Sequence, residues 1–340
     1  MRKLKVVQIG IRHEHANGKF KTLKSLPDAF ELAGMVDEAE FAKTPTYLSP
    51  RDATFELYKD EKFVTLDEVF AMPEIDAVLI EVPNLDLVPV AMRFAERGIP
   101  MHVDKPCGED LGAYKKLLDL VEAQHIPFQM GYVFRYNPAV RFAIDAVKSG
   151  MLGHVFMVET NMNHSYGGEA YQQYLTTFKG GVMFNLGCHL IDFLIEMLGC
   201  PEHVVSLLKG CEPGDPSLSN TLAILEYPHT HAVVGVASRD RMPKRRLRVE
   251  GTNGTLELCP IESFKGKGLE IALKLKEDFG SFRAGEQTVG FAPEYDRYAA
   301  QLLDFSAVVQ GEARDRWTRA HDYLVHEITL AAAGYITIRK

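Results

Sequence analysis

Several common sequence signatures are missing from this chain. It has no apolar run long enough to span a bilayer, so we expect no membrane partner. Its net charge is −8, and its single compact basic cluster, at residues 244–246, is flanked by a strand-like segment, so we expect no nucleic-acid partner. Residues 1–10 do not have the pattern of a signal peptide. The protein is therefore expected to be soluble and cytoplasmic.

Cysteines are few and irregularly spaced. The five cysteines form no CxxC pair, and their number is odd. We therefore expect reduced thiols, and neither a disulfide framework nor a cysteine-based zinc site.

What the chain does have is the composition of an ordinary globular protein, with 46% apolar and 25% charged residues. A length of 340 residues is sufficient for two domains.

Residues 1–131 alternate between short apolar strands and amphipathic helices. This alternation is typical of a parallel sheet covered on both faces, so it predicts a doubly wound α/β domain. An irregular insertion at residues 41–63 has no role that its sequence indicates. The expected strands are 5–9, 32–36, 77–82, 101–103 and 128–130, and the clearest helices are 88–97 and 111–124.

Residues 132–340 follow a different pattern. Longer segments alternate between apolar and polar residues, and turn residues such as Asn253 and Gly254 separate them, which indicates antiparallel pairing. We therefore predict a second, α+β domain with a mostly antiparallel sheet. The expected strands are 155–163, 221–226, 231–238, 247–250 and 254–258, and the expected helices are 138–149, 295–310 and 317–336.

A mostly apolar helix with one polar stripe is predicted at residues 185–196. Its polar residues Asn185, His189, Asp192 and Glu196 recur at helical spacing, so they share one narrow face. A helix that is apolar around most of its circumference is largely buried, and buried polar side chains are costly unless their hydrogen bonds are satisfied. Either the protein core satisfies this stripe, or the stripe faces a ligand.

The loop after the first expected strand is a weak match to a dinucleotide-binding fingerprint. Of the glycines in G-x-G-x-x-G only Gly10 is present, and Arg12 and His15 occupy the other two positions. Gly10, Ile11, Arg12 and His13 are nevertheless the residues that we expect to approach a cofactor, with Arg12 able to contact a phosphate.

Asp37 directly follows the second expected strand. A carboxylate at this point binds the hydroxyls of the adenine ribose and repels a 2′-phosphate, and Glu38 adds to the negative charge. A turn-forming aspartate at a strand end is the simpler alternative. On the first interpretation NAD is expected, and NADP is disfavoured.

Two further strands end in polar residues next to proline. Pro83 ends the strand at 77–82 and leaves Asn84 at the carboxyl edge of the sheet, where ligands of open α/β sheets bind. Asn84 could equally cap the following helix. Pro106 biases Lys105, which follows Asp104, toward an extended conformation at the same edge. A lysine shielded there can have its pKa, ~10.4 when unperturbed, drawn toward neutrality and act in proton transfer; a solvated lysine is the ordinary alternative.

The pair His13-x-His15 permits a different interpretation. A metal-dependent hydrolase on a TIM barrel carries an H-x-H pair at this kind of position. The alternation of strands and helices stops near residue 132, however, which disfavours a barrel. We therefore expect these histidines to be polar residues of the loop and helix start, and we expect no bound metal.

The motifs together resemble the Gfo/Idh/MocA family, which includes glucose–fructose oxidoreductase and inositol dehydrogenase. The resemblance covers nearly the whole chain and rests on Val-Pro-Asn at 82–84, Asp-Lys-Pro at 104–106, and the segments 131–138, 149–153, 180–192 and 250–254. It implies an N-terminal Rossmann domain over residues 1–131. It also implies an open sheet in residues 132–340 that binds substrate and forms a homo-oligomer, a dimer or tetramer, and it implies NAD or NADP as cofactor.

The resemblance further implies hydride transfer to or from a sugar, cyclitol or related polyol. Lys105 and His189 become the acid/base pair, and Asn185 stands where many relatives have aspartate, so it can orient substrate but cannot exchange a proton. Two alternatives keep the fold: net non-redox chemistry such as glycoside cleavage, and a sensor that has lost hydride transfer. The implied cofactor contacts are Gly10, Ile11, Arg12, His13, Asp37, Pro83, Asn84, Asp104 and Lys105, and the implied substrate contacts are Tyr132, Arg135, Asn163, His164, Tyr166, Asn185 and His189.

Overall fold

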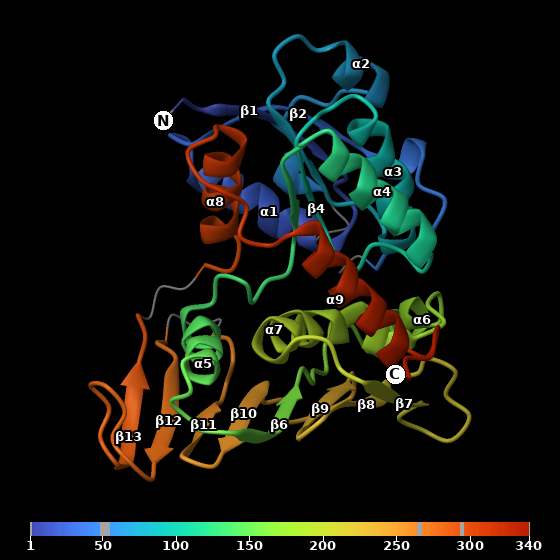
Figure 1. Cartoon of the computed structure of the whole chain (residues 1–340). Helices are drawn as coiled ribbons and strands as arrows, with labels where there is room; N and C mark the ends of the chain where they lie inside the picture. Colours follow the sequence, from blue (N-terminus) through green and yellow to red (C-terminus); the bar gives the residue numbers. More distant parts are fainter. Residues whose placement is uncertain (1, 48–54, 264–266, 293–295, 340) are drawn as a thin grey trace. The chain divides into compact units, whose positions relative to one another are not determined.

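The computed structural model describes residues 2–47, 55–263, 267–292 and 296–339, which form two compact units. Unit 1 comprises Met1–Tyr132 and Tyr298–Tyr323, and unit 2 comprises Val133–Arg297 and Leu324–Lys340. Figure 1 traces the elements of both. From the sequence we expected all of residues 132–340 in the second domain. The structure differs in that residues 298–323 belong to unit 1.

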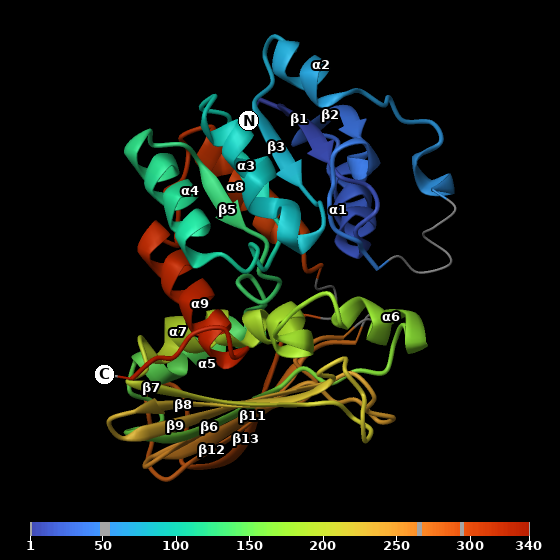
Figure 2. The same ribbon diagram turned by 90° about the vertical axis from the view of Figure 1, so that its right-hand side faces the viewer.

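Unit 1 is built on a five-stranded parallel sheet in the order β2-β1-β3-β4-β5. Helices cover both faces of this sheet (Figure 2), which confirms the expected doubly wound domain. An open sheet of this kind is not a barrel, so the TIM-barrel hydrolase interpretation is wrong. The elements are β1 (Leu4–Ile9), α1 (Glu14–Ser25), β2 (Phe30–Val36), α2 (Leu66–Ala71), β3 (Ala77–Ile80), α3 (Leu87–Ala95), β4 (Met101–Val103), α4 (Leu111–Ala123) and β5 (Phe128–Met130).

The strand order reverses between β1 and β3. From β1 the chain passes to β2 on one side of the sheet, and the later strands are added on the other side, beginning with β3. The point of reversal in an open α/β sheet is where ligands bind. The pairing of β3 with β1 stops where Ile9 faces Ile80, so β3 ends two residues before the expected position 82.

A helix near the C-terminus completes the core of unit 1. In α8 (Ala299–Val309), Leu302 and Phe305 pack with Leu4, Val6 and Leu79 of the central strands, and all of these side chains are buried. This packing explains why the segment belongs to unit 1 although it follows unit 2 in the sequence. The helix was expected at residues 295–310, and its first expected residue, Tyr295, lies outside the described residues.

Unit 2 holds an eight-stranded sheet in the order β13-β12-β11-β10-β6-β9-β8-β7, with helices against one face (Figure 2). All neighbouring strands are antiparallel except β6 and β9, so the mostly antiparallel open sheet is confirmed. The strands are β6 (Val155–Asn161), β7 (His203–Lys209), β8 (Asn220–Tyr227), β9 (Thr230–Ala237), β10 (Arg246–Gly251), β11 (Gly254–Leu258), β12 (Glu270–Leu275) and β13 (Gly285–Gly290), and the helices are α5 (Pro138–Lys148), α6 (Gly168–Leu175), α7 (Cys188–Leu198) and α9 (Arg319–Ala332), which begins in unit 1.

Three strands of this sheet were not expected from the sequence, namely β7, β12 and β13. The edge strand β13 is largely polar and partly exposed, so its extended conformation depends on pairing with β12 rather than on an apolar pattern of its own. Both edge strands of the sheet, β13 and β7, are thus among the strands that were not expected, and β12 is the neighbour of one of them.

The helix predicted at residues 185–196 is present but begins with an irregular turn. Met183–Gly187 form a π-helical turn, and α7 continues from Cys188. A Cβ on Gly187 would lie 2.4 Å from the sulfur of Met183, so the absence of a side chain lets this wide turn close. Turns of this type place residues at positions that a regular helix cannot reach, and Asn185 lies within it.

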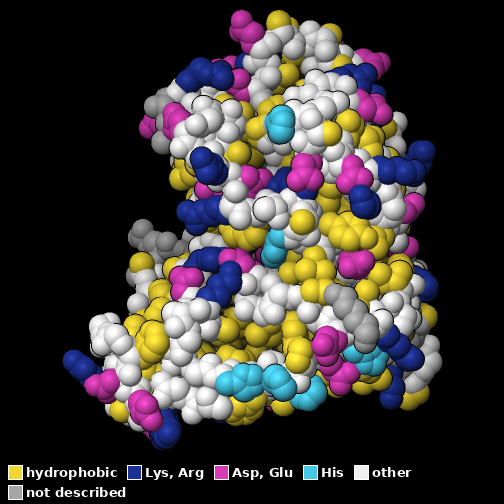
Figure 3. All heavy atoms as spheres, in the orientation of Figure 1, with side chains coloured by type: hydrophobic (Ala, Val, Ile, Leu, Met, Phe, Trp, Pro, Cys, Tyr) yellow, Lys and Arg dark blue, Asp and Glu magenta, His cyan; other side chains and the backbone are white. Residues whose placement is uncertain are grey.

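The surface carries charges of both signs. On the face drawn in Figure 3, basic and acidic side chains are interspersed, with no broad field of one sign. Among the residues that the structure describes, no helix combines the length and the apolar character that crossing a membrane requires.

Candidate functional site

A tight loop follows β1 at the point where the strand order reverses. Gly10 has φ = +105°, and a Cβ at this position would lie 2.4 Å from the carbonyl oxygen of Glu81, so only glycine fits. The N–H of Gly10 donates to the carbonyl oxygen of Val36 at 3.0 Å. The loop therefore lies directly against the ends of β2 and β3, at the edge where a ligand of such a sheet binds.

The backbone donors of this loop are bound to a carboxylate of the protein. Glu38 accepts hydrogen bonds from the N–H groups of Ile11 and Arg12 at 2.7 and 2.9 Å. Burial raises the pKa of Glu38, and these hydrogen bonds oppose the rise. From the sequence we expected Glu38 only to add negative charge beside Asp37. Its binding of the loop N–H groups was not predicted, and its position directly after Asp37 was the one sequence feature that pointed to this site.

Arg12 and Asp37 form an ion pair beside this loop. The guanidinium donates two hydrogen bonds to the carboxylate, of 2.6 and 2.7 Å, and lies 4.8 Å from the centre of the Phe55 ring. The hydrogen bond from Arg12 holds the pKa of Asp37 below its ordinary value. Asp37 lies at the end of β2 as expected, but the structure joins it to Arg12, whereas the sequence assigned these two side chains to different parts of a cofactor.

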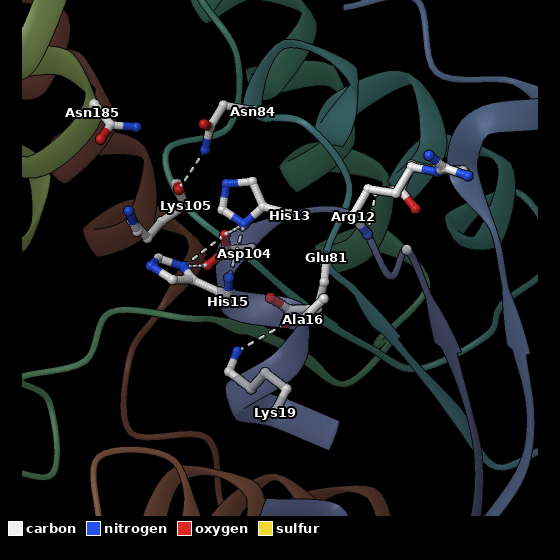
Figure 4. Close-up of polar contacts among 12 residues, drawn as sticks. Arg12, His13, His15, Ala16, Lys19, Glu81, Asn84, Asp104, Lys105 and Asn185 are labelled. Atoms are coloured by element: carbon white, nitrogen blue, oxygen red, sulfur yellow. Dashed lines mark hydrogen bonds and ion pairs between the residues drawn. The ribbon is translucent and has the colours of Figure 1, made fainter. Parts of the chain in front are cut away.

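The two histidines of the H-x-H pair meet an aspartate from the end of β4 (Figure 4). Nδ1 of His15 lies 3.0 Å from both carboxylate oxygens of Asp104, and Nδ1 of His13 lies 3.3 Å from Oδ2. Glu81, from the end of β3, completes a cluster in which one nitrogen or oxygen of each residue lies within 4.8 Å of the others. From the sequence we expected His13 and His15 at the loop and helix start, and Asp104 and Glu81 at the ends of two strands. The sequence did not predict that these four side chains come together.

Burial controls protonation in this four-residue cluster. It lowers the pKa of His13 to about 3, although Asp104 acts in the opposite direction. It raises the pKa of Glu81 to about 8. It also raises the pKa of Asp104, but the nearby His15 and His13 outweigh it and hold that pKa below its ordinary value. His13 is therefore a neutral imidazole at physiological pH, beside an ionised Asp104.

A second buried chain of polar groups extends from Glu81. Lys19 donates to Oε1 of Glu81 at 2.9 Å, and its ammonium also contacts Nε2 of His102. Nδ1 of His102 lies 2.9 Å from Oε1 of Gln129, so a neutral His102 carries its proton on Nδ1 and donates it there. No sequence pattern indicated this chain of contacts, although Glu81, His102 and Gln129 are polar residues within or next to short apolar strands.

Lys105 lies next to the cluster at the end of β4. Its side chain is buried, and its carbonyl oxygen accepts a hydrogen bond of 2.7 Å from Nδ2 of Asn84. The positive charge of Lys105 contributes to lowering the pKa of both His13 and Asp104. Asn84 therefore anchors the segment that carries Lys105. It does not cap α3, whose N-cap is Asp86, so the helix-cap alternative is wrong.

In unit 2 the polar stripe of the π-helical turn and α7 divides into two parts. Asp192 accepts hydrogen bonds of 2.8 and 3.1 Å from Arg135, and both side chains are buried. Glu196 accepts one of 2.6 Å from Arg141. The protein core thus satisfies this part of the stripe. Arg135 binds Asp192 in the structure, and its expected contact with substrate stays a prediction.

The other part of the stripe contains Asn185 and His189. Oδ1 of Asn185 accepts a hydrogen bond of 2.8 Å from the hydroxyl of Tyr171. Nδ1 of His189 accepts one of 3.4 Å from the N–H of Val133, so a neutral His189 carries its proton on Nε2. These contacts orient both side chains, and they assign to His189 the tautomer in which Nε2–H can donate a hydrogen bond.

An aromatic group lies beside Asn185 in unit 2. The rings of His164 and Tyr166 stack with centroids 3.7 Å apart, and Tyr171 lies 5.0 Å from His164. Neither ring nitrogen of His164 has a hydrogen-bond partner among the described residues, and burial lowers the pKa of His164 to about 3. The neutral imidazole therefore has one donor and one acceptor that no described residue satisfies.

Two other expected substrate contacts have structural roles. Asn163 accepts from the N–H of Ala237 at 3.0 Å and donates to Asp240 at 3.1 Å, so its amide joins the segment after β6 to the end of β9. Tyr132 is 1% exposed and is the last residue of the first segment of unit 1. A role in substrate binding stays a prediction for both.

The chain matches two models of one protein family. Residues 5–132 match the model described as the oxidoreductase family with an NAD-binding Rossmann fold. Residues 140–257 match the C-terminal domain of GFO/IDH/MocA proteins. Together the two matches cover both units and most of the chain.

Individual relatives are distant. The chain is 30% identical to the rhizopine catabolism protein MocA of Rhizobium meliloti over 96 residues, which is 28% of this chain and 30% of that protein. It is 26% identical to the uncharacterized oxidoreductase YhhX of Escherichia coli over 80% of this chain and 76% of that protein. It is also 28% identical to an inositol 2-dehydrogenase of Corynebacterium glutamicum over 33% of this chain and 34% of that protein.

Solved structures share the fold across the full length. An oxidoreductase from Agrobacterium radiobacter, solved with NAD+, L-tartaric acid and magnesium, superposes with a TM-score of 0.79 at 16% identity, covering 99% of this chain and 98% of that one. A putative NADPH-dependent oxidoreductase from Desulfitobacterium hafniense has a TM-score of 0.79 at 18% identity, with 99% and 96% covered. At these identities the likeness shows the fold alone.

Proposed function

The chain belongs to the Gfo/Idh/MocA family of oxidoreductases and has its NAD-binding Rossmann domain, and we propose that it transfers a hydride to or from one hydroxyl-bearing carbon of a sugar, cyclitol or related polyol. The observation that carries the proposal is the buried Lys105 at the carboxyl end of β4, whose main chain is held by Asn84. A dehydrogenase needs a proton donor and acceptor at this edge of the sheet, because hydride transfer changes the charge on the reacting oxygen.

The residues of unit 1 fit a nicotinamide dinucleotide. Gly10 would let the backbone approach a pyrophosphate closely, and the carboxylate of Asp37 would accept from the adenine-ribose hydroxyls. Pro83, Asn84 and Asp104 would border the nicotinamide end, and Ile11, Arg12 and His13 the phosphates. When bound, the nicotinamide supplies the acceptor or donor of the hydride.

We propose NAD as the preferred cofactor. A 2′-phosphate on the adenine ribose would face two carboxylates, those of Asp37 and Glu38. Arg12 provides one compensating positive charge, but its hydrogen bonds are directed to Asp37. The negative charge at the end of β2 therefore favours the free 2′-hydroxyl of NAD.

Lys105 and His189 are proposed as the acid/base pair. Lys105 would stabilise the oxygen of the reacting carbon as its charge changes. The ammonium of Lys105 would donate a proton to that oxygen in the direction of reduction, and its neutral amine would accept the hydroxyl proton in the direction of oxidation. His189 would support the transfer with a hydrogen bond from Nε2–H to the same oxygen. Asn185 would orient the substrate hydroxyl, because an amide donates and accepts hydrogen bonds but does not exchange a proton at neutral pH. Acid/base catalysis of this kind contributes roughly 10²–10⁴-fold to a rate.

A polyol or sugar is supported by the aromatic group of unit 2. Tyr166, His164 and Tyr171 present ring faces against which the C–H faces of a sugar can pack, next to the amide of Asn185. The neutral His164 adds a donor and an acceptor that suit hydroxyl groups. One of the relatives is an inositol 2-dehydrogenase, which fits a cyclic polyol.

A homo-oligomer formed through the open sheet, as a dimer or tetramer, is also part of the proposal. Arginine and glutamate pairs on β6, β10 and β11, including Arg246 with Glu159 and Arg248 with Glu257, would face the second subunit.

All five cysteines are free thiols, which supports a reducing compartment, the cytoplasm.

The proposed function is tested in two steps. The first is a fluorescence titration of the purified protein with NADH and, separately, with NADPH, in which saturable binding with tighter NADH is expected. The second screens cyclitols and sugars with NAD+, following the absorbance of the reduced cofactor and the products. Oxidised product in proportion to reduced cofactor supports dehydrogenation. Cleaved glycoside without net cofactor reduction would replace it with the non-redox alternative, and the absence of cofactor binding by the folded protein would favour a sensor.

A further inference from the structure

The proposed hydride transfer places His13 and Asp104 beside the cofactor, but it gives no role to the cluster that these two residues form with His15 and Glu81. All four residues belong to unit 1, and they come from the start of α1 and from the ends of β3 and β4. Asp104 and Glu81 are fully buried, His13 is 5% exposed, and the side chain of His15 retains 15% exposure. The cluster therefore has one member through which small solutes can reach it.

Within the cluster two hydrogen-bond acceptors face each other. Nδ1 of His13 accepts the N–H of His15 at 3.3 Å, so this nitrogen carries a lone pair and not a proton. The same nitrogen lies 3.3 Å from Oδ2 of Asp104, which also carries lone pairs. Two acceptors at this distance repel each other unless a proton or a cation lies between them.

One buried oxygen of the cluster has no hydrogen-bond partner among the described residues. Oε1 of Glu81 accepts from Lys19, but Oε2 is buried and has no hydrogen-bond partner among the described residues. A buried polar atom without a hydrogen-bond partner is unfavourable, whether the carboxyl is ionised or protonated. In Figure 4, Glu81 lies on the same side of the loop as the Asp104 carboxylate and the two imidazoles.

The distances suit a metal ion with short bonds. Tetrahedral ligands on bonds of ~2.0–2.1 Å lie roughly 3.4 Å apart. The nitrogen–oxygen distances from His15 and His13 to Asp104 are 3.0 and 3.3 Å, and the four ligand atoms of the cluster all lie within 4.8 Å of one another. We propose that His13, His15, Asp104 and Glu81 bind one divalent transition-metal ion of the zinc type.

The ligand set selects the class of metal. Two imidazoles with two carboxylates match the nitrogen and oxygen ligands of zinc and its neighbours, whereas magnesium and calcium take oxygen ligands almost exclusively. The positive charges of Lys19 and Lys105 oppose a cation, so we expect an exchangeable ion that a chelator removes. Because Lys105 directly follows Asp104, the bound ion would also hold in place the strand end that carries Lys105.

The test uses the full-length protein, stripped with a chelator and then titrated with zinc chloride in a calorimeter. We expect saturable binding of one ion per chain and a rise in the melting temperature, with no response to magnesium chloride at the same concentration. Substitutions His15→Ala and Glu81→Gln should each weaken zinc binding at least about tenfold. His229→Ala is the matched control, because His229 forms an exposed pair with His154 elsewhere on the protein and should leave binding unchanged.

Two results would overturn the proposal. One is the absence of saturable zinc binding. The other is binding that persists at wild-type affinity in His15→Ala, which would place the zinc on surface histidines. Circular dichroism checks the fold of each variant, and His15→Ala decides the outcome if Glu81→Gln does not fold. Neither cofactor nor substrate enters this test, so its failure leaves the proposed hydride transfer intact.

Discussion

Arg12 holds the carboxylate of Asp37 through two hydrogen bonds of 2.6 and 2.7 Å. The pair combines the two groups that distinguish nicotinamide cofactors, since a carboxylate binds the ribose hydroxyls of NAD and an arginine accommodates the 2′-phosphate of NADP. In the structure each group is bound to the other. We therefore expect cofactor preference to depend on which member of the pair the cofactor engages.

Replacing Asp37 by serine is expected to shift the preference toward NADPH. The substitution removes the acceptor for the ribose hydroxyls and releases Arg12 to meet a 2′-phosphate. We expect the ratio of the NADPH and NADH dissociation constants to change by at least tenfold, roughly 1.4 kcal/mol, in fluorescence titrations. Glu40→Ala is the control, because Glu40 is an exposed acid on the same turn and its loss changes net charge equally. An unchanged ratio in Asp37→Ser would show that Asp37 does not select the cofactor.

Lys105→Met and His189→Gln are expected to abolish most turnover while preserving the fold. Methionine approximates the length of the buried lysine without its charge, and glutamine retains hydrogen bonding without proton exchange at neutral pH. Each should lower kcat by about 10²–10⁴-fold, with NADH affinity changed much less. Steady-state kinetics on an identified polyol and cofactor titrations measure the two effects. Turnover at the wild-type rate in either variant would remove that residue from the acid/base pair.

Asp192→Asn is expected to destabilise unit 2 far more than Glu196→Gln. Both substitutions remove one negative charge from α7. The first leaves the buried Arg135 without its counterion, which costs about 3–5 kcal/mol of unfolding free energy. The partner of Glu196, Arg141, is partly exposed, so the second should cost about 1 kcal/mol or less. Denaturant unfolding followed by circular dichroism compares them, and equal losses would contradict a buried ion pair.

Asp215 is expected to make the stability of unit 2 sensitive to acid. Burial raises its pKa, but hydrogen bonds from Ser217, Ser219 and Cys211 outweigh this effect and lower the pKa to about 2. Because the unfolded chain has the ordinary value, ~3.9, the stabilising contribution is complete above that pH and is lost as the pH falls toward 2.

The measurement for Asp215 is urea unfolding of wild type and Asp215→Asn across a pH series. The difference in unfolding free energy should be constant near neutral pH and should shrink as the pH falls below about 4. A difference that stays constant down to pH ~2 would mean that the carboxylate is not stabilised in the folded state.

The local features of the site were accessible from sequence patterns. Gly10, Asn84 and Lys105 follow apolar strands of a βα repeat, and the carboxyl ends of parallel strands meet at one edge of a sheet. The motifs around Lys105 and His189 also indicated the family, which the comparisons confirm. These inferences succeeded because hydrophobic periodicity and proline or glycine stops act over a few residues.

Contacts between distant residues were not accessible in the same way. The sequence showed that Glu38, Lys19 and Glu81 are charged, but not that Glu38 binds the loop amides or that Lys19 pairs with Glu81. It also misassigned α8, whose apolar residues complete a core that lies far away in sequence. A polar side chain within an apolar pattern has many candidate partners, and the pattern alone does not choose among them.

By itself, the sequence determined the two kinds of sheet, the strand ends that carry Asn84 and Lys105, and the helical spacing of Asn185 and His189. Only the tertiary structure decided that His13 and His15 meet Asp104, and that Asp192 is neutralised by Arg135. The physical reason is the range of the forces that act. Backbone periodicity is set by neighbouring residues, whereas the partner of a buried charge is set by which strands and helices the whole fold brings within hydrogen-bonding distance.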